Sequence, residues 1–194
     1  LTSLDFVGWL VSGTGRWDLA LIIYADSVTA FDVLLNEVIS MCGTHLHEYN
    51  FTIVLSAEHL TYGFLKNKGI IKGMQQTEKK EAIILDAIDR KILKTIAQDA
   101  RIPITEIALK IKEPTHVVNY HLKNLIKKKV IEGFKPKLDV NKFDYQWHLL
   151  LIQFQTVSEK RKKEFLSYCK QHDKIYYITN TIGNYNVTLD IHAK

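Results

Sequence analysis

The chain has 194 residues, 46% of them hydrophobic, which is enough to bury one or two cores. No apolar run approaches the length of a membrane span and no signal-peptide pattern is recognisable, so we expect no membrane partner. Cys42 and Cys169 are isolated and lack metal-type spacing, which predicts a reduced, cytoplasmic compartment. The net charge of +5 is unevenly spread, because residues 71–140 contain 15 basic and 9 acidic side chains, whereas residues 1–70 contain 3 and 7. A polyanion is therefore the expected partner of the middle of the chain.

The first part of the chain has the pattern of a hairpin, a helix and a further strand. Residues 4–12 and 16–25 are predicted to be strands, joined by a Ser-Gly-Thr-Gly turn. An Asp-Ser pair is placed to cap a helix over residues 27–42, and Gly43 stands where a helix commonly ends. The alternation of polar and apolar residues over 49–55 predicts another strand.

Residues 85–134 have the pattern of three short helices followed by the start of a hairpin. In the first helix Asp86 is placed as the cap, and apolar residues recur at steps of three and four, namely Leu85, Ile88, Ile92 and Ile96. A second apolar stripe and a corner at residues 111–114 follow. The third helix is expected to turn four apolar residues inward, Val118, Leu122, Leu125 and Ile126. This arrangement indicates a helix-turn-helix.

The outer face of the third helix carries residues suited to nucleic acid. Asn hydrogen-bonds base edges, while Lys and Tyr reach bases or phosphates. Alternatively, the lysines at the helix end complement the helix dipole and stay solvated, and Tyr120 packs against the second helix. We expect Thr115 and the lysines to hold phosphates; the full candidate DNA-contact set is Thr115, His116, Asn119, Tyr120, Lys123, Lys127, Lys128, Lys129, Lys135 and Lys137.

The last part of the chain repeats the pattern of the first. Residues 148–156 are predicted to form a strand buried on both faces, and Ser158 to cap a helix. Residues 175–192 then have the pattern of a hairpin. The segment GTGRWDLALIIYA (13–25) aligns with TIGNYNVTLDIHA (181–193) at a constant offset of 168, which indicates an internal repeat.

These segments resemble the Lrp/AsnC (feast/famine) family of transcriptional regulators. The resemblance rests on LDAIDRKIL, RIPITEIALKI and VVNYHLKNLIKKKVIEGF, all within residues 85–134. Pro103 and Pro114 stand where the family usually has a capping serine, His121 where an arginine is common, and Lys129 where a glycine usually ends the helix. The resemblance implies a sequence-specific DNA-binding regulator, archaeal-like, whose paired third helices read half-sites about one helical turn apart.

In that family a β-α-β-β-α-β effector and assembly domain, called RAM, follows the helix-turn-helix, with a glycine-x-aromatic-aspartate signature. Residues 15–18 (GRWD) fit this signature, and residues 183–186 (GNYN) have Asn in the last place. The resemblance thus implies an α+β fold, a central winged helix-turn-helix flanked by partial ferredoxin-like RAM modules. The expected domains are residues 1–62, the C-terminal part of one RAM-like domain; 63–83, a linker; 84–137, the winged helix-turn-helix; and 138–194, the N-terminal part of a second RAM-like domain.

Two incomplete RAM modules imply a piece of a longer tandem protein. They also imply self-association, as a homodimer or higher oligomer, through the RAM sheets. We expect the helix over 27–42 and the strand over 49–55 to complete the C-terminal module, either within the chain or from a second copy.

The resemblance also implies an amino acid or a related small molecule as effector, bound at the glycine-rich hairpins. Exposed amides at a glycine turn accept a carboxylate, and Asp18 is suited to an ammonium group. A plain hairpin turn, with Trp17 in the core, is the alternative. The candidate effector residues are Gly13, Thr14, Gly15, Arg16, Asp18, Gly183, Asn184 and Asn186.

The sequence contains no recognisable catalytic motif, and we expect neither an enzyme nor a cofactor. His45 and His47 have no third ligand at a suitable spacing, so no metal site is predicted; His116 and His121 are interpreted as groove and flank residues. One alternative remains, a siroheme-decarboxylase-like enzyme or an effector-binding module with the same helix-turn-helix and RAM layout. In the enzyme alternative the site residues would be scattered histidines, namely His45, His47, His148 and His192.

Overall fold

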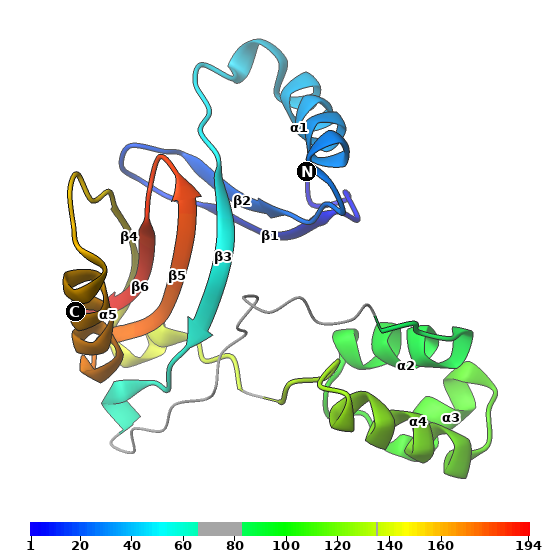
Figure 1. Cartoon of the computed structure of the whole chain (residues 1–194). Coiled ribbons are helices and arrows are strands. Elements are labelled where there is room, and N and C mark those ends of the chain that lie inside the picture. The colour runs from blue at the N-terminus through cyan, green and yellow to red at the C-terminus, as the bar shows by residue number, and fades with distance from the viewer. Residues whose placement is uncertain (66–82, 135) are drawn as a thin grey trace. The chain divides into compact units, whose positions relative to one another are not determined.

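The structure is a computed structural model that describes residues 1–65, 83–134 and 136–194. It separates into two compact units, Leu1–Phe51 and Thr52–Lys194 (Figure 1). None of the helices among the described residues is long and apolar enough to cross a membrane.

The N-terminal unit consists of a hairpin and a helix. Strands β1 (Val7–Ser12) and β2 (Leu19–Ile23) pair antiparallel, and α1 spans Val28–Cys42. The Ser27 hydroxyl accepts a hydrogen bond from the Ala30 N–H at 3.0 Å, and Gly43 ends the helix with φ 54°. The predicted hairpin and helix are therefore confirmed, although both strands are shorter than expected.

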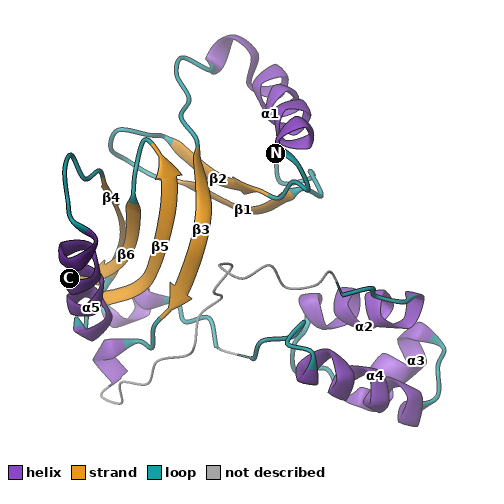
Figure 2. Ribbon diagram, in the orientation of Figure 1, coloured by secondary structure: helices purple, strands orange, loops and turns teal. Residues whose placement is uncertain are grey.

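The larger unit contains a four-stranded antiparallel sheet in the order β3-β5-β6-β4 (Figure 2). Its elements are β3 (Thr52–His59), β4 (Gln146–Ile152), α5 (Glu159–Gln171), β5 (Ile175–Gly183) and β6 (Val187–Ala193). As predicted, Ser158 caps α5 through its side chain. The core of this sheet contains Leu60, Cys169, Ile175, Ile178, Val187 and Leu189.

Strand β3 lies before the helix-turn-helix in the sequence but pairs with β5, which lies after it. The expectation that this strand completes the C-terminal module within the chain is thus confirmed, with observed bounds three to four residues later than 49–55. The same expectation for the helix over 27–42 stays a prediction, because α1 belongs to the other unit. The proposed domain boundary at residue 62 stays a prediction. Of the proposed linker, residues 63–65 form a 3₁₀ helix and residues 66–82 lie outside the described residues.

The prediction that residues 148–156 form a strand buried on both faces is wrong. Strand β4 is an edge strand of the sheet, and Leu149 and Leu150 are 37% and 46% exposed. A short apolar run gives no information about which faces a sheet covers, because that depends on neighbours distant in the sequence.

The internal repeat extends to the pairing of individual residues. In the first hairpin Trp9 pairs with Ile22. In the second hairpin Tyr177 pairs with Asp190, and each of these two residues lies 168 positions after its counterpart in the first pair. Both hairpins carry an irregularity between the first and third residues of the leading strand, between Val7 and Trp9 or between Ile175 and Tyr177. A shared bulge is a specific feature of strand pairing, so the two hairpins are versions of one structural unit.

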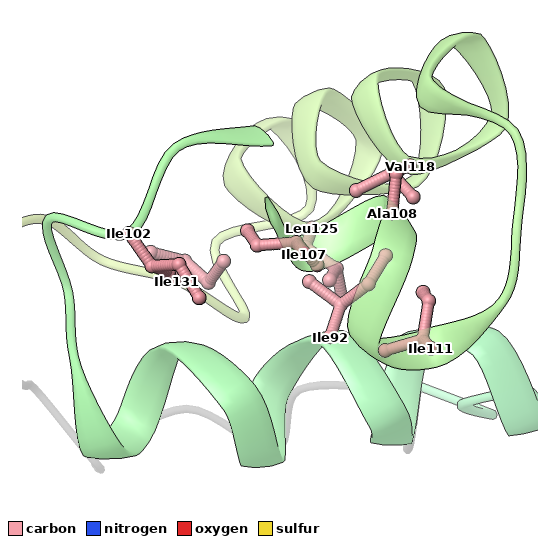
Figure 3. Packing of buried hydrophobic residues seen from close by; sticks show 8 residues of the cluster. All are labelled: Ile92, Ile102, Ile107, Ala108, Ile111, Val118, Leu125 and Ile131. Atoms are coloured by element: carbon pink, nitrogen blue, oxygen red, sulfur yellow. The ribbon is translucent and has the colours of Figure 1, made fainter. Parts of the chain in front are cut away.

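The helix-turn-helix consists of α2 (Ala87–Gln98), α3 (Ile104–Ile111) and α4 (Thr115–Lys127). Its core contains eight buried residues contributed by all three helices and their flanks (Figure 3): Ile92, Ile102, Ile107, Ala108, Ile111, Val118, Leu125 and Ile131. Leu122 packs against this core, but Ile126 is 46% exposed, so its predicted inward position is wrong. Residues 128–134 and 136–139 contain no strand, so the expected start of a hairpin is not observed in these residues.

Candidate nucleic-acid interface

Helix α2 begins with a capping box, which fixes its N-terminus within the helix-turn-helix. The Asp86 carboxylate accepts from the Asp89 N–H at 2.7 Å, and the Asp89 carboxylate accepts from the Asp86 N–H at 3.4 Å. The predicted cap at Asp86 is confirmed. Each carboxylate thereby satisfies a backbone donor that the first helical turn leaves without a partner.

Helices α3 and α4 begin differently, because proline takes the capping position in both. Pro103 and Pro114 have extended conformations, with ψ 145° and 143°, and neither helix has a side-chain cap. The corner between the helices is closed by Lys112 in the left-handed conformation, with φ 59°, and by a hydrogen bond from the Glu113 N–H to the Ala108 carbonyl at 3.0 Å. This short corner sets α4 against α2 and α3.

The outer face of α4 is polar and open to solvent, as the spacing predicted. Thr115, His116, Lys123 and Lys127 are exposed and Asn119 is partly exposed. Tyr120 is 64% exposed, so its ring does not pack in the core. A shallow depression at the start of this face is lined by Ile104, Thr115, His116 and Asn119. These six polar residues, called the ridge below, thus share one accessible surface, although their individual roles stay predictions.

The lysines that follow α4 are also at the surface. Lys127, Lys128, Lys129 and Lys137 are exposed, whereas Lys135 lies outside the described residues. Lys129 has φ 56°, the left-handed conformation that commonly ends a helix and that favours glycine. The chain therefore retains a lysine at a position where the backbone prefers glycine.

His121 lies on the inner side of α4, so its interpretation as a flank residue next to DNA is wrong. Its Nδ1 atom is 2.8 Å from Oδ1 of Asp89 and 3.6 Å from Oδ2 of Asp86. The side chains of His121 and Asp89 are only 16% and 12% exposed. This contact joins α4 to the start of α2, and sequence reasoning missed it. Two features of the sequence could have indicated this contact. His121 replaces the arginine that is common at its position in the Lrp/AsnC family, and Asp86 and Asp89 lie three residues apart at the start of the first helix.

The candidate effector residues lie in two hairpins that belong to separate units. Gly13, Thr14, Gly15, Arg16 and Asp18 are exposed at the turn between β1 and β2. In the turn between β5 and β6, Gly183 and Asn184 are exposed, while Asn186 is partly buried and hydrogen-bonds the last residue of β4 and the segment that follows it. The Asn186 Oδ1 atom accepts from the Phe154 N–H at 2.7 Å, and the Asn186 N–H donates to the Ile152 carbonyl at 2.8 Å.

The histidines considered for an enzyme do not assemble on one surface of the sheet. His148 pairs with Ile191 and Trp147 pairs with His192, so His148 and His192 project from opposite faces. His192 is 6% exposed and stacks on Tyr62 and Tyr176, and its burial lowers its pKa. A buried neutral ring in an aromatic stack explains His192 without a ligand.

Sequence relatives point to one class of protein. A family profile described as winged helix-turn-helix DNA-binding matches residues 85–132. An HTH-type transcriptional regulator of Pyrococcus horikoshii is 25% identical over 111 residues, 57% of this chain and 74% of that protein. A second regulator of that organism is 42% identical over 50 residues, 26% of this chain and 31% of its own length. The regulatory protein AsnC of Haemophilus influenzae is 24% identical over 107 residues, 55% of this chain and 71% of AsnC. The chain is thus similar to Lrp/AsnC-type regulators, and its residues 85–132 match a DNA-binding winged helix-turn-helix.

Solved structures of Lrp/AsnC-type proteins share the fold. An AsnC family transcriptional regulator from Agrobacterium tumefaciens superposes with a TM-score of 0.52 at 19% identity, over 56% of this chain and 72% of that one. A regulator of Neisseria meningitidis in complex with L-Met superposes with a TM-score of 0.51 at 14% identity, over 57% and 71% of the two chains. The relatives are described as transcriptional regulators, which favours a regulator over the siroheme-decarboxylase alternative.

Proposed function

We propose that this chain is an Lrp/AsnC-type regulator that reads double-stranded DNA in the cytoplasm by placing the outer face of α4 in the major groove. The observation that carries the proposal is the exposed polar ridge on α4, which lies outside a core that holds all three helices. An α-helix fits the width of the major groove, and a ridge of Asn, His, Tyr and Lys offers both base and phosphate contacts.

Within the ridge, Asn119 is suited to contact a base edge, because its amide both donates and accepts hydrogen bonds. His116 and Tyr120 flank it, and the depression beside His116 and Asn119 leaves room for a base edge. The lysines at positions 127–129 and 137 extend the same exposed region and would neutralise phosphates. Asn119 would thus supply sequence preference, and the lysines would supply general affinity.

The test is binding of the whole chain to duplex DNA at two salt concentrations. A preferred sequence is first selected from random duplexes, and affinities are then measured by fluorescence anisotropy. We expect Asn119→Ala to lower affinity for the preferred sequence by about ten- to a hundredfold while leaving random DNA unaffected. Asn124→Ala is the matched control, because Asn124 lies on the same helix about 140° away. Absence of salt-dependent duplex binding by the wild-type chain would refute the proposal.

The lysines give a separate test. Replacing Lys127 and Lys128 by Ala should weaken binding to all sequences alike and should reduce the slope of log affinity against log salt by about 1.8. A loss confined to the preferred sequence would instead assign these lysines to base contacts.

We also propose that an amino acid or a related molecule binds at the exposed β1–β2 turn, and that the chain self-associates through its sheets. Support for the ligand comes from the free, exposed Asp18 side chain in a glycine-rich turn and from the complex of the Neisseria meningitidis relative with L-Met. Isothermal titration calorimetry with a panel of amino acids tests ligand binding at the β1–β2 turn. We expect Asp18→Ala to abolish the heat of binding. Light scattering at several protein concentrations tests self-association. A monomeric mass at every concentration would contradict self-association.

A further inference from the structure

Three potential metal ligands meet where the start of α2 contacts the middle of α4. They are the carboxylates of Asp86 and Asp89 and the imidazole of His121, and one donor atom from each lies within 4.8 Å of the others. We propose that they form a binding site for a divalent first-row transition metal, with Zn²⁺ as the representative ion. Carboxylate and neutral imidazole are common ligands for such ions. The site is separate from the outer face of α4, so the inference does not depend on the proposed function.

The capping box prepares the two carboxylates for this role. One oxygen of each, Oδ1 of Asp86 and Oδ2 of Asp89, accepts a backbone N–H of the first helical turn. The remaining oxygens, Oδ2 of Asp86 and Oδ1 of Asp89, are the atoms nearest to Nδ1 of His121. Hydrogen bonds that hold a carboxylate in place are the usual support of a metal ligand, because they fix its orientation before the ion arrives.

The spacing of the donor atoms suits a small ion. Nδ1 of His121 lies 2.8 Å from one carboxylate oxygen and 3.6 Å from the other. Ligands of tetrahedral zinc, at about 2.0–2.1 Å from the ion, lie about 3.3 Å from one another. Small adjustments of the three side chains therefore complete three corners of the tetrahedron. The Asp86 side chain is 55% exposed, so the fourth corner opens to water.

Charge favours a cation at the same place. Two carboxylates face one imidazole, and that imidazole balances at most one negative charge by taking up a proton. Lys128 acts on Asp86 electrostatically, but its side chain is exposed. A divalent ion would balance both carboxylates and would accept the Nδ1 lone pair of His121. The bound ion would then link α2 directly to α4.

The competing explanation is a plain ion pair between His121 and the aspartates, and one substitution separates the two. His121→Arg keeps a cation facing both carboxylates, which preserves the helix contact, but guanidinium is not a metal ligand. His121→Gln removes both the charge and the metal ligand. The full-length chain is used for both variants, in a buffer free of chelators.

The experiment measures Zn²⁺ affinity by competition with a chromogenic chelator, and hydrogen exchange of α2 and α4 amides with and without Zn²⁺. We expect one equivalent of Zn²⁺ to bind the wild-type chain and to slow exchange in both helices. Both variants should bind Zn²⁺ at least about tenfold more weakly and show no metal-dependent slowing. Co²⁺ should give visible absorption bands with the wild-type chain that neither variant reproduces.

Two results would overturn the proposal. One is equal Zn²⁺ affinity in the wild-type chain and His121→Arg, which would place the ion elsewhere, for example at His45 and His47. The other is the absence of Zn²⁺-dependent protection in α2 and α4 of the wild-type chain, which would leave His121 in an ion pair only.

Discussion

Gly15 and Gly183 occupy equivalent positions in two hairpins, 168 residues apart, and both have positive φ, 141° and 129°. The hydrogen bond that closes each turn is repeated as well. The Gly13 N–H donates to the Asp18 carbonyl at 3.1 Å, and the Thr181 N–H donates to the Asn186 carbonyl at 2.9 Å. The repeat thus preserves backbone conformation at a position where most side chains are unfavourable.

Replacing Gly15 or Gly183 by Ala should destabilise the corresponding hairpin by about 1–2 kcal/mol, because a Cβ is unfavourable in this conformation. A Cβ at Gly15 would meet no atom within 4 Å, so the whole cost there comes from the backbone. Hydrogen exchange of the strand amides measures the effect. Gly13→Ala is the control: it also meets no atom within 4 Å and lacks positive φ, so it should be nearly neutral.

Lys129→Gly should stabilise the helix-turn-helix by about 1 kcal/mol, because glycine adopts φ 56° without strain. The same substitution should weaken DNA binding at low salt if Lys129 contacts phosphate. Lys112→Gly provides the comparison, since Lys112 has φ 59° but is not in the predicted contact set. It should give the same gain in amide protection without loss of DNA affinity. Equal losses of affinity in the two variants would argue against a specific role for Lys129.

The half-buried carboxyl of Asp190 should make the free energy of unfolding depend on pH. Burial raises its pKa to about 6, although the Trp147 Nε1–H donates to it and favours the charged form. The folded state therefore holds the proton more tightly than the unfolded chain. The stabilisation from this proton is complete below pH ~4 and is lost as pH rises through about 6.

Asp190→Asn should remove this pH dependence. The amide oxygen still accepts from Trp147, and no charge is buried at neutral pH. We expect the variant to be more stable than the wild-type chain at pH 7.5 by roughly 2–3 kcal/mol, with a smaller difference at pH 4.5. Urea denaturation at a series of pH values measures both. If the free energy of unfolding of Asp190→Asn differed from that of the wild-type chain by the same amount at every pH, the pH dependence could not come from Asp190.

Substitution of Asn186 can distinguish a structural role of its side chain from a role in binding the proposed effector. Its side chain accepts from the Phe154 N–H, so Asn186→Ala should leave a half-buried donor unsatisfied and cost about 1–2 kcal/mol. Asn186→Asp keeps an acceptor and should be tolerated. Thermal unfolding compares the variants. If Asn186→Ala changes amino-acid binding without changing stability, the side chain acts on the effector rather than on β4.

Local features of the chain could be predicted because they depend on neighbouring residues. Asp86, Ser27 and Ser158 cap helices as their types and positions indicated. The buried positions of α4 followed from helical periodicity, with Ile126 as the exception near the helix end, where the apolar stripe meets solvent.

Features that depend on distant partners could not be predicted. The contact between His121 and Asp89 spans 32 residues and replaces an expected surface role. The exposure of Leu149 and Leu150 depends on β4 being an edge strand, which its own residues do not determine. The bounds of β3 shifted because they are set by pairing with β5, over residues 177–183.

The pairing of β3 with β5 also determines how the helix-turn-helix is attached. The three helices of the helix-turn-helix are an insertion into one sheet, since β3 precedes them while β4, β5 and β6 follow them. Two backbone connections therefore join these helices to the sheet. A domain at the end of a chain is joined by only one connection. A single proteolytic nick between β3 and α2 would therefore leave both fragments joined through the β3–β5 hydrogen bonds. Release of the helix-turn-helix would require a second cut before β4.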